Sequence, residues 1–418
     1  MLRSDPSNQE LQAAILEACK TVQAYDPQCE SGRAPYLWRL IALTGRSDYF
    51  WRTLLDSLDH FDQADNARNI VQIHGVLCLL APERSGLEQR RLHEFIQSEA
   101  VRKAGFLDVA HPCGENLIRL EGLGAFLVLI GLYFIELLNN IQEQNGWAYR
   151  AWLEALRAKE GDAATAAALT EARSSHAELD RLMSYDTVED QRAGPHAAVR
   201  RDAEEASGYT AIKASLDPKK GFPRLWIKSA SADELFSAAS DLLLETDEAR
   251  VLAYLRIFVT RDYPLNPETL FPIVESENRR SSWHAIRVLR RLHDHRVRNF
   301  AFELLESGRE IPGAVLLLCS NYMPGDFVAI ERAVRDVRFD DDGWHSLGTS
   351  VLNLLASAPV PPNETRDMLL ALYEKTPCSL CREEIVRRLH DHDLVPGWMA
   401  RECEFDADPE TASIFETP

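Results

Sequence analysis

The chain has 418 residues, of which 45% are hydrophobic and 27% are charged, and its formal net charge is -19 at pH 7. These proportions are typical of a folded globular protein and exclude a disordered or collagen-like chain. The length allows two or three ordinary domains, or one array of stacked repeats. The negative charge repels phosphate backbones, so nucleic acid is an unfavoured partner.

The first residues and the cysteines both bear on the cellular compartment. The segment MLRSDPSNQE lacks the basic stretch and the apolar run of a secretory signal. The eight cysteines are too sparse over this length to form a disulfide framework. We therefore expect a cytoplasmic protein with reduced thiols.

One apolar run requires a test as a membrane span. Residues 122–135, GLGAFLVLIGLYFI, carry no charge and lie between Glu121 and Glu136. A span needs about 20 apolar residues, and basic rather than acidic residues usually flank it. We expect instead a helix that is buried on all sides, and no membrane partner.

A helical hairpin is predicted near the N-terminus. Apolar residues at spacings of three and four predominate along the chain, with almost no period-two alternation. Residues 36–41 lead to Gly45, and Ser47 opens a second apolar stripe that continues to Leu58. Gly45 fits a helix C-cap and Ser47 an N-cap, so two antiparallel helices are expected.

Three further stripes in the C-terminal third repeat this pattern. They span residues 297–305, 327–337 and 344–355. We expect Gly308 to close the first helix, Asp326 to open the second and Asp342 to cap the third. The prolines within residues 359–362 end the third stripe.

Each predicted helix is short and has one apolar face, so neighbouring helices must stack to bury it. We therefore expect an all-α fold, with antiparallel helical hairpins stacked into an α-α superhelix. The expected parts are an N-terminal helical-hairpin array (1–158), a helix followed by a charged, Pro- and Gly-containing loop or linker (159–228), a C-terminal array (229–404) and a loose acidic tail (405–418).

The linker region has two parts. An alanine-rich stretch from Asp162 to Met183 predicts one helix. Residues 185–225 then mix charged residues, glycine and proline without apolar periodicity, which indicates a long loop. The loop is either a passive tether or a flap over a binding surface, and the sequence does not decide between them.

Several helix starts resemble those of HEAT repeats. In residues 293–305, HDHRVRNFAFELL, Asp294 and Arg298 stand in the places of that family's Asp and Arg. A shorter version, Asp-x-Ala-Arg, occurs from Asp247 to Arg250 and from Asp65 to Arg68. The separation of Arg250 and Arg298 is of the order of one HEAT unit, roughly 40–47 residues.

The resemblance to HEAT-repeat proteins carries expectations about architecture and role. It implies a curved, two-layered stack of helices whose inner face holds proteins, peptides or, less often, nucleic acid. It also implies that the Asp and Arg side chains of the motif bond within or between repeats and thereby stabilise them.

One candidate binding site is a basic stripe in an otherwise acidic chain. Its members are Arg279, Arg280, Arg287, Arg290 and Arg291, with Trp283 beside them. The stripe is either a solvated face paired with nearby acids or a binding site for an acidic peptide, a phosphate or RNA. Trp283 would stack on a ligand in the second case and join the core in the first.

A separate cluster contains residue types that bind metals: Cys378, Cys381, His390 and His392. Thiolates and imidazoles are good zinc ligands, although this spacing is unorthodox. The alternatives are two packed thiols with two solvated histidines, or a redox pair with Cys378 near a helix N-terminus. Cys381 shares a helical face with Ile385 and Leu389, which directs it toward the core.

No P-loop, GxGxxG, GxSxG or HExxH motif occurs, so we expect no enzyme and no cofactor beyond the zinc just considered. The favoured function is a non-catalytic interaction or scaffold module that binds a protein or acidic peptide on a concave face. Two alternatives stay open. One is a HEAT-like nucleic-acid-binding protein or DNA glycosylase-type enzyme, and the other is a zinc or redox sensor using Cys378 and Cys381.

Overall fold

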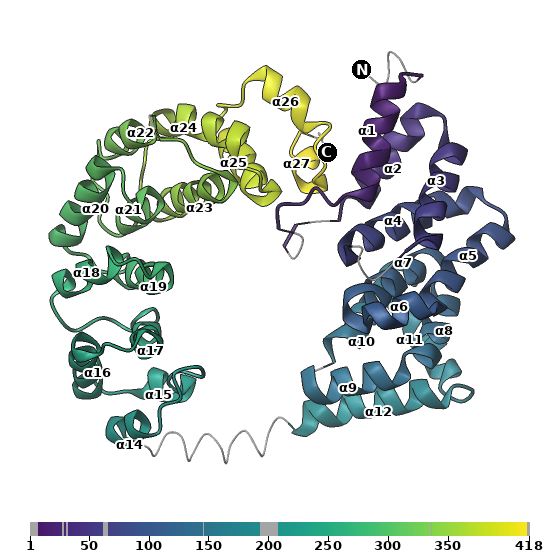
Figure 1. The fold of residues 1–418 in the computed structure, drawn as a ribbon, viewed down its shortest axis with the longest axis horizontal. Coiled ribbons are helices and arrows are strands. Elements are labelled where there is room, and N and C mark those ends of the chain that lie inside the picture. The colour runs from purple at the N-terminus through teal and green to yellow at the C-terminus, as the bar shows by residue number, and fades with distance from the viewer. Residues whose placement is uncertain are drawn as a thin grey trace. The chain divides into compact units, whose positions relative to one another are not determined.

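The computed structural model describes residues 7–26, 29–30, 32–61, 66–144, 146–192, 208–335 and 337–415. Within these ranges the regular secondary structure is helical and includes no β-strand. The expected all-α fold class is therefore confirmed (Figure 1).

The chain divides into two compact units, Met1–Gly194 (unit 1) and Pro195–Pro418 (unit 2). The buried hydrophobic residues form two separate clusters, one in each unit. The boundary lies inside the segment 159–228 that composition alone sets apart.

Unit 1 is built on four helices, α2, α4, α7 and α10, which pack against one another in that order. The other helices lie against this series. For example, α1 contacts α2 and α4, and α9 contacts α10. The elements are α1 (Gln9–Lys20), α2 (Ala34–Thr44), α3 (Ser47–Asp59), α4 (Ala67–Leu80), η1 (Ala81–Glu83), α5 (Gly86–Gln97), α6 (Glu99–Ala104), η2 (Phe106–Ala110), α7 (His111–Glu121), α8 (Leu123–Leu132), α9 (Phe134–Gln144), α10 (Trp147–Glu160), α11 (Asp162–Ala172) and α12 (Ala177–Arg192).

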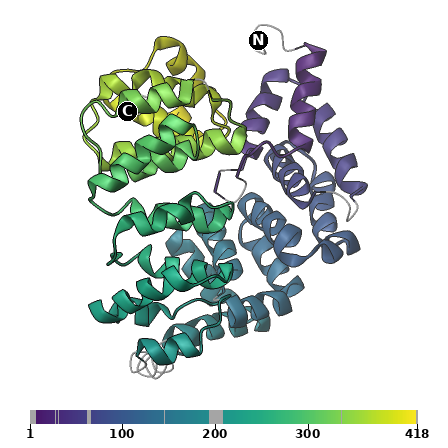
Figure 2. The same cartoon turned by 60° about the vertical axis from the view of Figure 1, so that its left-hand side comes forward.

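Unit 2 contains two interleaved series of helices. In one series α17, α19, α21, α23 and α25 contact in succession, and in the other α20, α22 and α24 do. Figure 2 shows the helices following one another in chain order, from teal to yellow. The elements are α14 (Tyr209–Ala214), α15 (Arg224–Ser229), α16 (Ala232–Leu244), α17 (Glu248–Phe258), η3 (Pro267–Leu270), α18 (Phe271–Val274), α19 (Arg279–Leu289), α20 (His295–Ser307), α21 (Ile311–Leu317), α22 (Phe327–Arg335), α23 (Asp341–Ser357), α24 (Pro362–Lys375), α25 (Ser379–Asp391), α26 (Gly397–Cys403) and α27 (Pro409–Ser413).

Helix α20 shows how the sequence specifies these elements. Asp294 is its N-cap, and its carboxylate accepts the Arg296 backbone N–H. The predicted stripe from Val297 to Leu305 is buried at every apolar position that the period requires. Gly308 ends the helix in the left-handed conformation, at φ 68°, which glycine adopts without strain.

Among the other predicted caps, Gly45 is confirmed, whereas Ser47 and Asp342 are wrong. Gly45 is confirmed as the C-cap of α2, at φ 65°. Ser47 is not an N-cap, because it is the first helical residue of α3, after Arg46. Asp342 is not one either. Asp340 caps α23 by accepting the Gly343 N–H, and Asp342 lies in the first turn.

The apolar run 122–135 is not one buried helix as expected. It divides between α8 and α9, with Tyr133 at the break. The side chains of Val128, Leu132 and Ile135 are 46%, 44% and 60% exposed. The run therefore has one buried side and one exposed side.

Across the described residues, no individual helix combines the length and the apolar character that a membrane crossing requires. The pair Leu123–Leu132 and Phe134–Ile141 meets the criteria only when taken together, and its two halves are bent by 83°.

The linker and the tail contain more structure than expected. The helix predicted from Asp162 to Met183 is two helices, α11 and α12, and α12 continues to Arg192. Within the predicted loop 185–225, α14 and the start of α15 are also helical, whereas residues 193–207 lie outside the described ranges. In the expected loose tail, α27 packs on α25 and buries Thr411 completely.

Candidate functional site

The Asp and Arg residues of the repeat motif have separate partners in α20. The Asp294 carboxylate caps its own helix and pairs with Arg296 at 2.7 Å. Arg298 instead reaches Asp326, directly before α22, with Nη2–Oδ1 and Nε–Oδ2 distances of 2.5 and 3.0 Å. This two-pronged ion pair joins α20 to the start of α22, through a carboxylate that is buried and a guanidinium that is partly exposed.

The other motif copies differ from this arrangement. Asp247 caps α17 by accepting the Arg250 backbone N–H at 2.9 Å, and the Arg250 guanidinium pairs with Glu245. Asp65 lies outside the described residues. Arg68 has no ion pair with any described acid and lines a pocket instead.

Helix α19 carries the predicted basic stripe. Ile286 and Leu289 are fully buried on one side of the helix, and the arginines lie on the opposite side. Trp283 lies between Arg280 and Arg287 in helical spacing and is 42% exposed, so it does not belong to the core. No ring contact with Trp283 is found within the described part of the chain.

Most of these arginines have no acidic partner among the described residues. Arg291 is the exception, since it approaches Asp262 at 3.6 Å and donates to the Val259 carbonyl at the end of α17. We define the arginine face as the arginines of α17, of α19 and of the α19 C-cap that make no ion pair with any described acid: Arg256, Arg279, Arg280, Arg287 and Arg290.

Part of the arginine face surrounds His284. Its Nδ1 atom lies 2.9 Å from the Arg280 carbonyl oxygen. Burial lowers the pKa of His284, and the positive charges of Arg287, Arg256 and Arg280 lower it further. Because Arg256 belongs to α17, guanidinium groups from two adjacent helices act on one imidazole.

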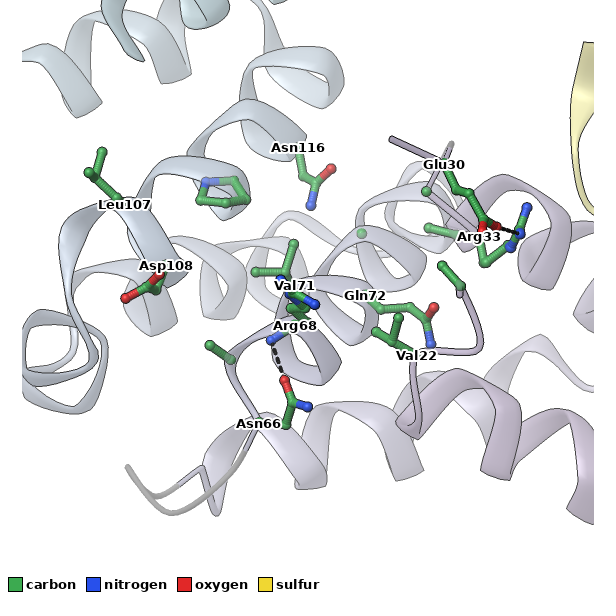
Figure 3. A pocket seen from close by; sticks show the side chains of 16 residues that line it. Val22, Glu30, Arg33, Asn66, Arg68, Val71, Gln72, Leu107, Asp108 and Asn116 are labelled. Atoms are coloured by element: carbon green, nitrogen blue, oxygen red, sulfur yellow. Dashed lines mark hydrogen bonds and ion pairs between the residues drawn. The ribbon is translucent and has the colours of Figure 1, made fainter. Parts of the chain in front are cut away.

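Unit 1 contains a pocket of about 490 Å³ among α2, α4, η2 and α7. Figure 3 shows Glu30 and Arg33 at one side, Asp108 at the other, and Arg68 between them. Glu30 and Arg33 form a buried ion pair, and the Arg33 Nη1 atom has no hydrogen-bond partner in the described structure. Two guanidinium groups and two carboxylates line the pocket, so its charge does not select one class of ligand.

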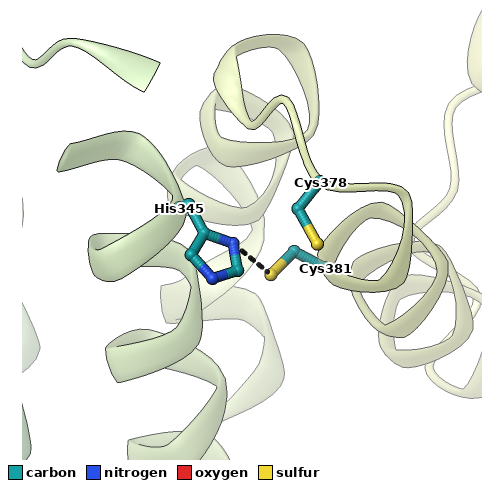
Figure 4. A group of neighbouring side chains, drawn as sticks. All are labelled: His345, Cys378 and Cys381. Atoms are coloured by element: carbon teal, nitrogen blue, oxygen red, sulfur yellow. Dashed lines mark hydrogen bonds between the residues drawn. The ribbon is translucent and has the colours of Figure 1, made fainter. Parts of the chain in front are cut away.

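A compact group of sulfur and nitrogen atoms lies between α23 and α25 (Figure 4). Cys378 is the N-cap residue of α25, and Cys381 lies in its first turn, with the thiol directed at the core as expected. The Cys381 Sγ atom is 3.6 Å from Nδ1 of His345, which belongs to α23. The ligand atoms of all three residues lie within 4.8 Å of one another.

The two thiols polarise each other. The Cys381 thiol donates to the Cys378 sulfur, and this contact together with backbone N–H groups of α25 lowers the pKa of Cys378. The same contact, followed by burial, raises the pKa of Cys381. Cys378 is therefore the more readily ionised thiol.

The predicted histidines lie elsewhere. His390 is in the last turn of α25 and packs its ring on Phe415, and His392 follows that helix. Nine residues separate Cys381 from His390, which is about 13 Å along a helix. The structure thus brings the two cysteines together with His345 and not with His390 or His392.

The chain matches no protein-family model, no curated protein and no solved structure with which it was compared. The HEAT resemblance therefore remains a prediction from sequence motifs.

Sequence reasoning missed three residues at these sites: Arg256, Asp326 as a partner of Arg298, and His345. Arg256 had a signal, because it is the one charged residue in the apolar stretch VLAYLRIF of α17. Asp326 and His345 had none, since each meets its partner only through the packing of two helices distant in sequence.

Proposed function

We propose that unit 2 is a HEAT-like array of helical hairpins that holds an acidic segment of a partner protein on its arginine face. Two features support the array. The helices pack in two interleaved series that follow chain order, as helices with one apolar face must. The Arg298–Asp326 pair is also the kind of bond between repeats that the HEAT resemblance implies.

The observation that carries the choice of partner is the gathering of guanidinium groups around His284. In a chain with a net charge of -19, acids are abundant, yet these arginines pair with none of those described. Like charges that act on one imidazole also repel one another, so an anionic ligand would relieve the repulsion. Guanidinium groups bind carboxylates through two parallel hydrogen bonds, and exposed Trp283 adds apolar contact area.

A peptide suits this face better than nucleic acid does. An extended phosphate backbone would be repelled by the net charge of the whole chain. A short acidic segment experiences mainly the local positive field of α17 and α19. The role we propose is therefore binding of a protein partner without catalysis.

The test is fluorescence anisotropy with a labelled, short, glutamate-rich peptide that contains one tyrosine. We expect wild-type protein to bind it, with affinity that falls as salt concentration rises. The triple variant Arg280→Glu, Arg287→Glu, Arg290→Glu should bind at least about tenfold more weakly, because charges that attract the peptide then repel it.

The matched control reverses three exposed arginines outside the arginine face: Arg332→Glu, Arg335→Glu and Arg338→Glu. It changes the net charge of the chain equally, so it should retain the wild-type affinity. Equal weakening of both variants would show that only the average charge matters and would refute the site. Tighter binding of duplex DNA or single-stranded RNA than of the peptide, lost in the first variant, would favour nucleic acid instead.

A further inference from the structure

Two packed helices bring His345, Cys378 and Cys381 together. His345 lies in the second turn of α23, and the cysteines lie at the start of α25. The helices approach closely here, since a Cβ added at Gly348 would lie 4.0 Å from the Cys381 Cβ. The cluster therefore depends on the core packing of unit 2 and not on a loop.

One spacing among the ligand atoms equals that of a tetrahedral metal site, and the others are close to it. Zinc binds cysteine sulfur at about 2.3 Å and histidine nitrogen at about 2.0–2.1 Å, so a tetrahedron places these two atoms roughly 3.6 Å apart. The observed distance from Cys381 Sγ to His345 Nδ1 is 3.6 Å. The Cys378 Sγ atom lies within 4.8 Å of both, so a small adjustment of its side chain completes the third corner.

The surroundings suit a divalent ion that binds two thiolates. Cys378 and Cys381 are almost completely buried, so an uncompensated charge on the pair would be costly. One divalent cation with two thiolates and a neutral imidazole has no net charge. A monovalent ion such as Cu(I) would leave one negative charge in the core.

A neighbouring hydroxyl group is also placed to stabilise a thiolate at Cys381. The Thr349 side chain lies one helical turn after His345, and its hydroxyl oxygen is 3.7 Å from Cys381 Sγ. A hydroxyl that donates to a ligating thiolate stabilises its negative charge. His345 is only half-buried, so the cluster lies partly within reach of solvent.

We infer that unit 2 carries a zinc site whose protein ligands are Cys378, Cys381 and His345, with water in the fourth position. The ligand set corrects the choice of His390 and His392 made from sequence spacing. Three protein ligands and a water distinguish it from a closed structural site, which has four protein ligands. The inference does not depend on the proposed binding of an acidic peptide.

The experiment uses the full-length chain, purified under reducing conditions and loaded with zinc chloride alone. After removal of loosely bound metal with a chelator, elemental analysis should find one zinc ion per chain. Cobalt substitution should give a thiolate-to-metal charge-transfer band and the intense visible bands of a tetrahedral ion.

His345→Ala is the most informative variant, because its side chain is partly exposed and its removal leaves both thiols in place. It should weaken zinc binding by more than the roughly 10- to 100-fold that loss of an outer-shell partner costs. The double variant Cys378→Ser, Cys381→Ser should abolish binding and the charge-transfer band. Helical circular dichroism establishes that each variant is folded.

The matched control is His390→Ala, His392→Ala, which should retain one zinc ion with wild-type affinity. Loss of zinc in this control, or undiminished binding in His345→Ala, would overturn the ligand set. A wild-type chain that stays free of zinc, holds only Cu(I), or forms a Cys378–Cys381 disulfide that persists under reducing conditions would overturn the site itself.

Discussion

His74 is a buried imidazole in the centre of α4. Its Nδ1 atom lies 3.6 Å from the Cys78 sulfur, and its ring packs on Phe95 with centroids 5.9 Å apart. Burial lowers the pKa of His74 to about 3, because a charged imidazole loses its hydration in the core. The folded protein therefore holds this side chain neutral at pH values where the unfolded chain takes up a proton.

This difference predicts how unit 1 responds to acid. Below the unfolded pKa of about 6.5 the unfolded chain binds a proton that the fold excludes, so stability is present above that pH and is lost as the pH falls. We expect His74 to contribute a loss of about 2 kcal/mol between pH 7 and pH 5.

Denaturant unfolding of wild-type protein and His74→Leu at the two pH values measures this contribution. The variant should lose distinctly less stability than wild type on acidification, whatever its stability at pH 7. The same loss in both proteins would contradict a neutral, buried His74. Other buried histidines, such as His111, contribute equally to both proteins and do not affect the comparison.

Gly114 marks the closest approach of α7 and α10. A Cβ added there would lie 2.7 Å from a ring atom of Trp152, which is fully buried. We expect Gly114→Ala to lower the free energy of unfolding by about 1–3 kcal/mol, because the indole cannot move without displacing the core. Gly124→Ala, at an exposed position of α8 with open space at its Cβ, is the control. It should be neutral or slightly stabilising, and a similar loss at both glycines would mean that packing is not the cause.

At the scale of the elements, the Arg298–Asp326 pair links α20 to α22. Asp326 also accepts the Met323 backbone N–H, so its buried carboxylate has three donors. We expect Asp326→Ala to cost about 2–3 kcal/mol, because the partly buried Arg298 guanidinium is left without its counter-charge and the Met323 N–H without its acceptor. A double-mutant cycle with Arg298→Ala should give a coupling energy of about 1–3 kcal/mol.

An exposed pair provides the comparison for this cycle. Lys103 and Glu99 are 59% and 79% exposed, and ion pairs in such positions contribute little. The same cycle at this pair should give no measurable coupling. If the Arg298–Asp326 coupling were equally small, the pair could not be a structural link between α20 and α22.

The element scale also shows what sequence patterns reveal. The predicted stripe of α20 was correct because burial on one side of a helix imposes a period of 3.6 on the chain. The break at Tyr133 was missed because the only local mark is Gly131, and a single glycine inside an apolar run does not by itself end a helix. Tyr133 is buried, and its hydroxyl donates to the Ile96 carbonyl at 2.6 Å, a contact from another helix that accompanies the break.

A local signal was overlooked between α11 and α12. Ser174 and Ser175 donate their hydroxyls to carbonyls at the end of α11, at 2.9 and 3.2 Å. Serines that bond to the nearby backbone compete with helix continuation, so the Ser174-Ser175 pair predicts a break. Alanine-rich flanks concealed it, and the segment was interpreted as one helix.

At the scale of the whole molecule, the all-α class followed from periodicity, whereas the sites followed only in part. The arginines of α19 were recognisable because they recur on successive turns of one helix. The ligand His345 was not recognisable, since 33 residues separate it from Cys378 and only the packing of α23 on α25 unites them. Sequence spacing therefore favoured His390 and His392, which are nearer in the chain but distant along α25.

Reversing the charge of the arginine face tests most directly whether this surface selects the partner. The variant Arg280→Glu, Arg287→Glu, Arg290→Glu is titrated with two labelled peptides of equal length, one rich in glutamate and one rich in lysine. If the arginine face selects its partner by charge, wild-type protein binds the acidic peptide more tightly and the variant binds the basic peptide more tightly. Each difference in affinity should exceed about tenfold. A variant that keeps the preference for the acidic peptide would contradict the proposed function.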